Sequence, residues 1–163
     1  MKRVVITGLG AITAVGEGAL SLWEAVKAGR SGIDVIEFGE GAGAWKTIGA
    51  RIPDFEPEKY VTQRKSLKVM ARDIQLAVAG ASLAIGDSGI KRNSYDADRF
   101  GVILGSGVLN HELDELAYSV GNSLGDDKKL SLKKFGDTGL SILFPLWLLK
   151  YLPNMPACHI SIL

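Results

Sequence analysis

The sequence predicts an α/β fold of which this chain holds only a part. Two short segments, residues 3–7 and 99–104, are apolar and partly β-branched, and each is followed by glycine, as buried strands often are. A long helix is expected over residues 63–86, and its later turns are apolar or small almost all round. Two strands are too few for a complete α/β sheet beside such a helix, so we expect an incomplete layered fold.

Composition indicates a soluble globular chain. Its 163 residues can bury about 69% of the unfolded surface. The content of 47% hydrophobic and 23% charged residues excludes a disordered chain. With 19 Lys and Arg against 18 Asp and Glu, the net charge of +1 provides no basic surface for nucleic acid or an anionic membrane. One cysteine excludes a disulfide framework and suits a reducing, cytoplasmic compartment.

The N-terminal part is expected to alternate short elements with glycine turns. After the first strand, residues 8–16 are predicted to be a loop because three glycines interrupt them. Residues 17–28 are predicted to form a helix with its large apolar side chains on one face. Residues 39–43, with three glycines, are expected to be a loop, and residues 45–60, with two prolines, an irregular segment.

The helix predicted at residues 63–86 has the clearest periodicity. Its apolar positions recur every three or four residues: Leu67, Met70, Ala71, Ile74, Val78, Ala81 and Ile85. Its first turns carry four cations: Arg64, Lys65, Lys68 and Arg72. These cations form either a solvated helix end or a phosphate site, and the sequence favours the solvated end.

The C-terminal part is expected to be mostly helical. Residues 112–124 and 154–162 are predicted helices, and residues 141–151 a helix that is kinked or begins near Pro145. The charged stretch 126–134 is expected to be an exposed loop.

No segment predicts a membrane partner. The start of the chain superficially resembles a signal peptide, but glycines interrupt its apolar run. Residues 140–152 are the most apolar later stretch. They contain Pro145 and Lys150 and fall short of the roughly 20 apolar residues that a spanning helix needs.

Two motifs invite functional interpretations that their context does not favour. A Gly-x-Gly pair after the first strand suggests dinucleotide binding, but Thr13 stands where the fingerprint needs a third glycine. Cys158 and His159 are adjacent, and neighbours on a helix do not face each other, so they are not a nucleophile and its base. Cys158 is expected to be a buried core residue, and His159 a hydrogen-bonded structural one. With two histidines in the chain, no metal site is expected.

Four segments, in their order and spacing, resemble the N-terminal part of a β-ketoacyl-acyl carrier protein synthase, a condensing enzyme of the thiolase-like superfamily. They are the opening strand and glycine turn at residues 3–16, the run from the tryptophan to Gly-Arg-Ser-Gly-Ile at 23–33, the helix with Asp-Ser-Gly at 64–89, and residues 99–107 with 154–160. None is specific alone, but together they cover essentially the whole chain.

The resemblance implies that residues 1–163 are an incomplete N-terminal half of a thiolase-like α-β-α layered fold. The complete protein would be an acyltransferase that condenses an acyl thioester with malonyl-acyl carrier protein and releases carbon dioxide, in fatty acid or polyketide synthesis. Its partners would be acyl carrier protein, acyl thioesters and a second subunit in a homo- or heterodimer. No cofactor is implied.

The same resemblance implies that the nucleophilic cysteine and two histidines come later than these residues. The chain would then be truncated before its catalytic residues and inactive by itself, and Cys158 would not be the nucleophile. Without its second half, such a piece should expose a large apolar surface and form dimers or rearrange its C-terminal helices.

Four residues match a dimer interface and acyl tunnel in the resemblance: Ser106, Pro145, Leu146 and Trp147. The bulk of Trp147 would shorten such a tunnel, unless Trp147 is plain core or interface packing. The sequence departs from the family pattern after Gly107 and at residues 149–153. These departures leave open a non-catalytic partner similar to a chain-length factor. A small nucleotide-binding domain is the second alternative.

Overall fold

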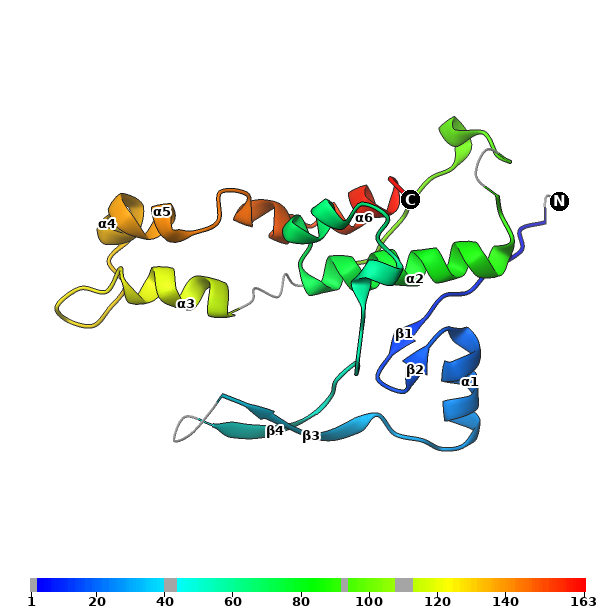
Figure 1. Cartoon of the computed structure of the whole chain (residues 1–163), viewed down its shortest axis with the longest axis horizontal. Coiled ribbons are helices and arrows are strands. Elements are labelled where there is room, and N and C mark those ends of the chain that lie inside the picture. The colour runs from blue at the N-terminus through cyan, green and yellow to red at the C-terminus, as the bar shows by residue number, and fades with distance from the viewer. Residues whose placement is uncertain (1–2, 40–43, 92–93, 108–112) are drawn as a thin grey trace. The chain divides into compact units, whose positions relative to one another are not determined.

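The computed structural model describes residues 3–39, 44–91, 94–107 and 113–163 (Figure 1). The chain divides into two compact units. The first consists of residues 1–62, 76–101 and 163, and the second of residues 63–75 and 102–162. All four residues predicted for the interface and tunnel belong to the second unit.

The first unit contains two separate antiparallel hairpins. β1 (Ile12–Thr13) pairs with β2 (Gly16–Glu17) around a tight turn. After α1 (Ala19–Lys27), β3 (Ile33–Phe38) pairs with β4 (Trp45–Ala50) over their full lengths. Neither sheet includes the two strands that the sequence predicts.

The two predicted buried strands are wrong. Residues 3–7 and 100–104 have no regular structure, and a single 3₁₀ turn, η4 (Ala97–Arg99), precedes the second segment. Ile6 is 83% exposed and Ile103 fully exposed, at 100%. A strand is stable only when a neighbour satisfies its backbone groups, and no strand of the described ranges pairs with these segments. The β-branched composition therefore has no sheet to join here.

The helix predicted at residues 17–28 is confirmed as α1. It ends at Lys27 with Ala28 as its C-cap, and Gly29 follows with a φ of 64°, which glycine adopts without strain. The large apolar side chains of this helix, Leu20, Trp23 and Val26, are all mostly exposed.

The β3–β4 hairpin corrects the prediction that residues 45–60 are irregular. Phe38 and Trp45 are cross-strand partners with ring centroids 4.7 Å apart, and the Arg51 guanidinium lies 5.9 Å from the Phe38 ring centroid. Such pairs stabilise a hairpin by up to about 1 kcal/mol each, and both prolines of the segment come after β4. The loop predicted at 39–43 falls, apart from Gly39, outside the described residues.

The long helix begins later than predicted. The 3₁₀ segment η3 (Arg64–Val69) comes first, and α2 spans Arg72–Ser88. Met70 between them is extended (φ −110°, ψ 113°), and the Gln75 side-chain amide donates to its carbonyl at 3.0 Å. All four cations of this region are exposed, which agrees with a solvated segment rather than a phosphate site.

α2 buries one face and is not enclosed all round. Ile74, Val78 and Ala79 are buried, whereas Ala81 and Ile85 are only half-buried. The other sides of α2 are therefore only partly covered within the described residues.

The N-terminal segment packs closely on the later turns of α2. A Cβ added to Gly10 would overlap the Gly80 carbonyl oxygen, and one added to Gly8 would lie 2.6 Å from the Ser88 backbone nitrogen. Between the two glycines, the Leu9 amide donates to Asp87 Oδ2 at 2.8 Å. The first unit thus needs glycine at two positions of this turn because backbone meets backbone there.

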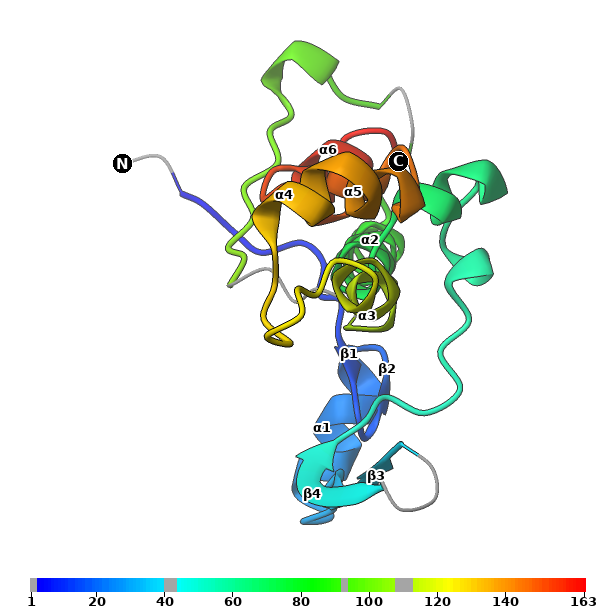
Figure 2. The ribbon, with the colours of Figure 1, turned by 90° about the vertical axis from the view of Figure 1, so that its left-hand side faces the viewer.

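In the second unit, α3 (Leu113–Gly121) lies beside a helical run that changes type twice (Figure 2). The run consists of α4 (Leu132–Lys134), the π-helical η5 (Phe135–Gly139) and α5 (Leu140–Ile142). The buried Ser119 hydroxyl donates to the Gly139 carbonyl at 2.6 Å, and the buried Ser123 hydroxyl donates to the Ser119 carbonyl at 2.7 Å. The first of these bonds joins α3 to the π-helical turn, and the second ties the residues that follow α3 back to it.

The predicted C-terminal elements have mixed outcomes. α3 confirms a helix within the predicted range 112–124, although it ends at Gly121, and α6 (Met155–Ile160) confirms a helix within 154–162. The loop predicted at 126–134 is wrong for its last three residues, because the Ser131 hydroxyl caps α4 by accepting from the Lys134 amide at 3.3 Å.

The helix predicted at residues 141–151 is interrupted. α5 ends at Ile142, and the 3₁₀ segment η6 (Trp147–Tyr151) follows Pro145. The residue before a proline disfavours the helical region, which accounts for a break at Phe144.

Many large apolar side chains of the described residues are uncovered, as the sequence analysis expects for an incomplete fold. Large apolar side chains are exposed on both units, among them Val4, Trp23, Ile48, Ile103, Leu132 and Leu148.

Candidate functional site

The predicted interface and tunnel residues lie in two places of the second unit. Pro145 and Leu146 are exposed in the segment between α5 and η6, with Leu146 at 48%. Trp147 is half-buried, and its ring lies 5.1 Å from that of Tyr151 at an angle of 52°. Trp147 thus packs against Tyr151 on one side of its ring. Ser106 is exposed in the irregular segment at residues 100–107.

A polar cluster that the sequence analysis missed joins α3 to η6. The Glu115 carboxylate forms an ion pair with Lys150, and its other oxygen, Oε2, accepts from the Tyr151 hydroxyl at 2.9 Å. Glu115 and Lys150 are largely covered, with side chains 27% and 15% exposed. One feature of the sequence indicates such a cluster. Lys150 lies in an apolar run, and a lysine that is covered there needs a partner for its charge.

Opposing effects act on the pKa of Glu115. Burial raises it, but hydrogen bonds from Lys150 and Tyr151, the Lys150 charge and a smaller contribution from Trp147 outweigh burial and lower the pKa below its ordinary value of 4.5. The carboxylate is therefore ionised at neutral pH and linked to its donors.

Glu115→Gln is expected to cost stability at neutral pH but not in strong acid. Because the folded pKa is lower than the unfolded one, the carboxylate stabilises the fold above the unfolded pKa, and this contribution is lost as the pH falls through the folded pKa. Allowing for partial exposure, we expect a loss of about 1–2 kcal/mol at pH 7. Urea unfolding of wild type and variant between pH 7 and pH 3 measures the difference.

The matched control is Glu37→Gln, which removes the exposed ion pair with Lys46 on the hairpin and should change stability by less than about 0.5 kcal/mol. A deficit for Glu115→Gln that stays constant across the pH range would contradict the prediction.

Two expectations for α6 are wrong. Cys158 is exposed, because Pro156 faces the interior and a residue two positions later points about 200° away. His159 Nε2 is buried without a hydrogen-bond partner among the described residues, and burial lowers the pKa of this histidine. An exposed thiol beside an inward-facing imidazole does not form a nucleophile–base pair, as the sequence spacing predicts.

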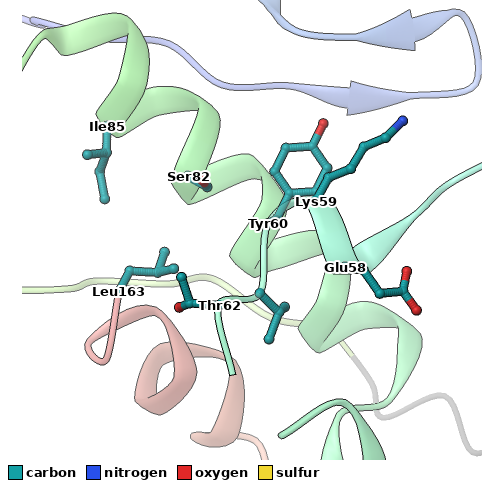
Figure 3. A pocket seen from close by; sticks show the side chains of 8 residues that line it. Glu58, Lys59, Tyr60, Thr62, Ser82, Ile85 and Leu163 are labelled. Carbon is teal, nitrogen blue, oxygen red and sulfur yellow. The ribbon is translucent and has the colours of Figure 1, made fainter. Parts of the chain in front are cut away.

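A cavity of ≈ 320 Å³ in the first unit lies between η2 (Pro57–Lys59), the segment that follows it and α2 (Figure 3). The Tyr60 hydroxyl donates to Glu17 Oε2 at 2.5 Å. This bond, with burial and the Glu17 charge, raises the pKa of Tyr60 to about 12. The described residues that line the cavity include neither cysteine nor histidine.

The described ranges show neither a metal-binding cluster nor a membrane-spanning helix. These residues hold no group of three or more His, Cys, Asp or Glu placed to bind a metal ion. They also include no helix long and apolar enough to cross a membrane.

The whole chain, residues 1–163, matches the family described as "Beta-ketoacyl synthase, N-terminal domain". The 3-oxoacyl-[acyl-carrier-protein] synthase 2 of Vibrio cholerae is 35% identical over 117 residues, which are 72% of this chain and 28% of that protein. The protein of the same name from Staphylococcus aureus is 29% identical over 161 residues, 99% of this chain and 35% of that protein. The chain thus spans about a third or less of the length of these relatives.

Solved ketosynthases share the fold. A β-ketoacyl synthase from Burkholderia phymatum aligns with a TM-score of 0.68 and 25% identity, over 99% of this chain and 36% of the other. The ishigamide ketosynthase/chain length factor aligns with a TM-score of 0.66 and 23% identity, over 96% and 36%. These likenesses support a thiolase-like α/β fold, here with mixed helix and strand. The chain belongs to the β-ketoacyl synthase family, whose N-terminal domain it matches over its whole length.

Proposed function

We propose that this chain is the N-terminal portion of a 3-oxoacyl-[acyl-carrier-protein] synthase and forms part of a thiolase-like α-β-α layered fold. The family match over all 163 residues carries the proposal. The uncovered segments at residues 3–7 and 102–104 support it, because their composition suits strands of a central sheet that other parts of the complete protein would extend.

The proposed reaction is a decarboxylating Claisen condensation. A thiolate of the complete synthase attacks an acyl-carrier thioester, forms the acyl-enzyme and releases the carrier thiol. Malonyl-acyl carrier protein then loses carbon dioxide. The resulting carbanion attacks the acyl-enzyme carbonyl, a 3-oxoacyl-carrier thioester forms, and the enzyme thiolate leaves. Backbone N–H donors stabilise the oxyanion of each tetrahedral intermediate.

We assign no step of this reaction to Cys158. It lies on the exposed side of a six-residue helix, and the buried nitrogen of His159 faces another way. The 163 residues are accordingly proposed to be inactive by themselves, with the catalytic thiol and histidines supplied by other segments of the complete protein.

The proposed dimer and tunnel surface is the segment before η6. Pro145 and Leu146 are free to meet a partner because they are exposed and apolar. Trp147, at the start of η6, and Ser106 are proposed to lie at the edge of the same interface. The dimer is either a homodimer or a pair with a second synthase subunit.

The test is a condensation assay on the protein at its natural length, with an acyl-acyl carrier protein and malonyl-acyl carrier protein. We expect carbon dioxide release and a 3-oxoacyl product, and the Cys158→Ala variant should keep wild-type activity. Loss of activity in Cys158→Ala would show that the thiol is misassigned. A protein that releases no carbon dioxide alone, but raises condensation by a catalytic subunit, would instead be a non-catalytic partner.

A further inference from the structure

One carboxylate on α3 fixes the orientation of η6. Lys150 and Tyr151 are neighbours on η6, and each donates to a different oxygen of Glu115. A carboxylate held at both oxygens resists rotation as well as displacement. Because Tyr151 is buried and Glu115 mostly covered, water competes weakly for these bonds.

The same contact extends to Trp147. The Tyr151 ring, whose hydroxyl binds Glu115, packs against the Trp147 ring at the start of η6. Three large apolar residues around this point stay exposed, and we call them the apolar ledge: Phe144, Leu146 and Leu148. The place of the ledge is therefore tied to the Glu115 carboxylate through Tyr151 and Trp147.

We infer that Glu115 is a positioning residue that sets the place of Trp147 and of the apolar ledge, and thereby the acyl chain length that the synthase accepts. The inference rests on the proposed function, in which the segment before η6 borders the acyl tunnel. A pocket that gains or loses room for one methylene changes selectivity by about tenfold or more. A small movement of η6 would therefore be enough to change the room in the tunnel by one methylene.

The first readout needs no activity. The indole ¹H–¹⁵N signal of Trp147, assigned with Trp147→Phe, is compared between wild type and variants of the chain. Glu115→Gln keeps the shape but loses the charge, and Tyr151→Phe loses one hydrogen bond but keeps the ring. Both should shift or broaden the Trp147 signal. The control Glu37→Gln, which alters the ion pair with Lys46 on the hairpin, should leave it unchanged.

The second readout is the ratio of kcat/KM for a long and a short acyl thioester in the complete synthase. Glu115→Gln should change this ratio by about tenfold, Tyr151→Phe by less, and Glu37→Gln not at all. A purely structural role of Glu115 would lower both kcat/KM values together and leave their ratio unchanged.

The outcomes separate the inference from the proposed function. An unchanged Trp147 signal in Glu115→Gln overturns the positioning role whatever the activity. If Trp147→Ala alters the length ratio but Glu115→Gln does not, the inference is wrong and the proposed function stands. If the wild-type complete protein does not condense at all, the proposed function fails, and the assigned effect on chain length fails with it.

Discussion

Gly10→Ala is expected to destabilise the packing of the N-terminal segment on α2 by about 3 kcal/mol, at the upper end of what overpacking costs. The new Cβ would overlap the Gly80 carbonyl oxygen and lie 2.7 Å from the Ala84 amide nitrogen. Both atoms belong to the backbone of α2, so no side-chain rotation relieves the contact. The segment must move away, and the bond from the Leu9 amide to Asp87 is lost with it.

Hydrogen exchange over the α2 amides measures this effect. A loss of about 3 kcal/mol corresponds to a protection decrease of about a hundredfold. The matched control is Gly86→Ala on the same helix, where an added Cβ meets nothing within 4 Å. That substitution should stabilise α2 by about 0.5–1 kcal/mol, because alanine favours the helix. Unchanged protection in Gly10→Ala would show that α2 and the glycine turn are not in contact.

This contact also bears on the nucleotide-binding alternative. The Gly-x-Gly pair has a structural reason, since both glycines face the backbone of α2 within the first unit. A pyrophosphate would need the same close approach to the turn. The sequence alone could not distinguish packing on α2 from pyrophosphate binding, because both require a residue without a Cβ.

Elements with local causes could be predicted from the sequence. Apolar periodicity and a glycine stop identify α1, and the same periodicity identifies α3 and α6. The start of α2 could not be placed, because Met70 leaves the helix and the Gln75 side chain satisfies its carbonyl. Residues 3–7 could not be predicted either. They have the composition of a strand, but a strand forms only when a neighbour distant in the sequence pairs with it.

The candidate site residues also differ in how far the sequence leads to them. Pro145, Leu146 and Trp147 are assigned from the family resemblance, and their role at an interface or tunnel stays a prediction. The Glu115 cluster does not, since its members lie 35 and 36 residues apart and meet only when α3 and η6 pack together. Only the lysine in the apolar run hinted at a buried partner, and several acidic residues could have supplied it.

Gly139→Ala is expected to destabilise the second unit by about 2–3 kcal/mol. Gly139 has ordinary helical dihedral angles (φ −61°, ψ −41°), so alanine would be favoured there on propensity alone. However, the new Cβ would lie 2.5 Å from Ser123 Oγ and 2.7 Å from Phe135 Cδ2. Relief of these contacts would separate η5 from α3 and strip the buried Ser119 hydroxyl of its acceptor, the Gly139 carbonyl.

A gain in stability, rather than a loss, is expected for the same substitution three residues earlier in the π-helical turn. Gly136 is exposed, and an added Cβ meets nothing within 4 Å, so Gly136→Ala should gain about 0.5–1 kcal/mol from helix propensity. Hydrogen exchange of the α3 amides reports both variants, because α3 contacts η5 directly. Equal effects of the two substitutions would mean that propensity alone governs η5. A loss confined to Gly139→Ala would show that the close packing of Gly139 against Ser119 and Ser123 stabilises this unit.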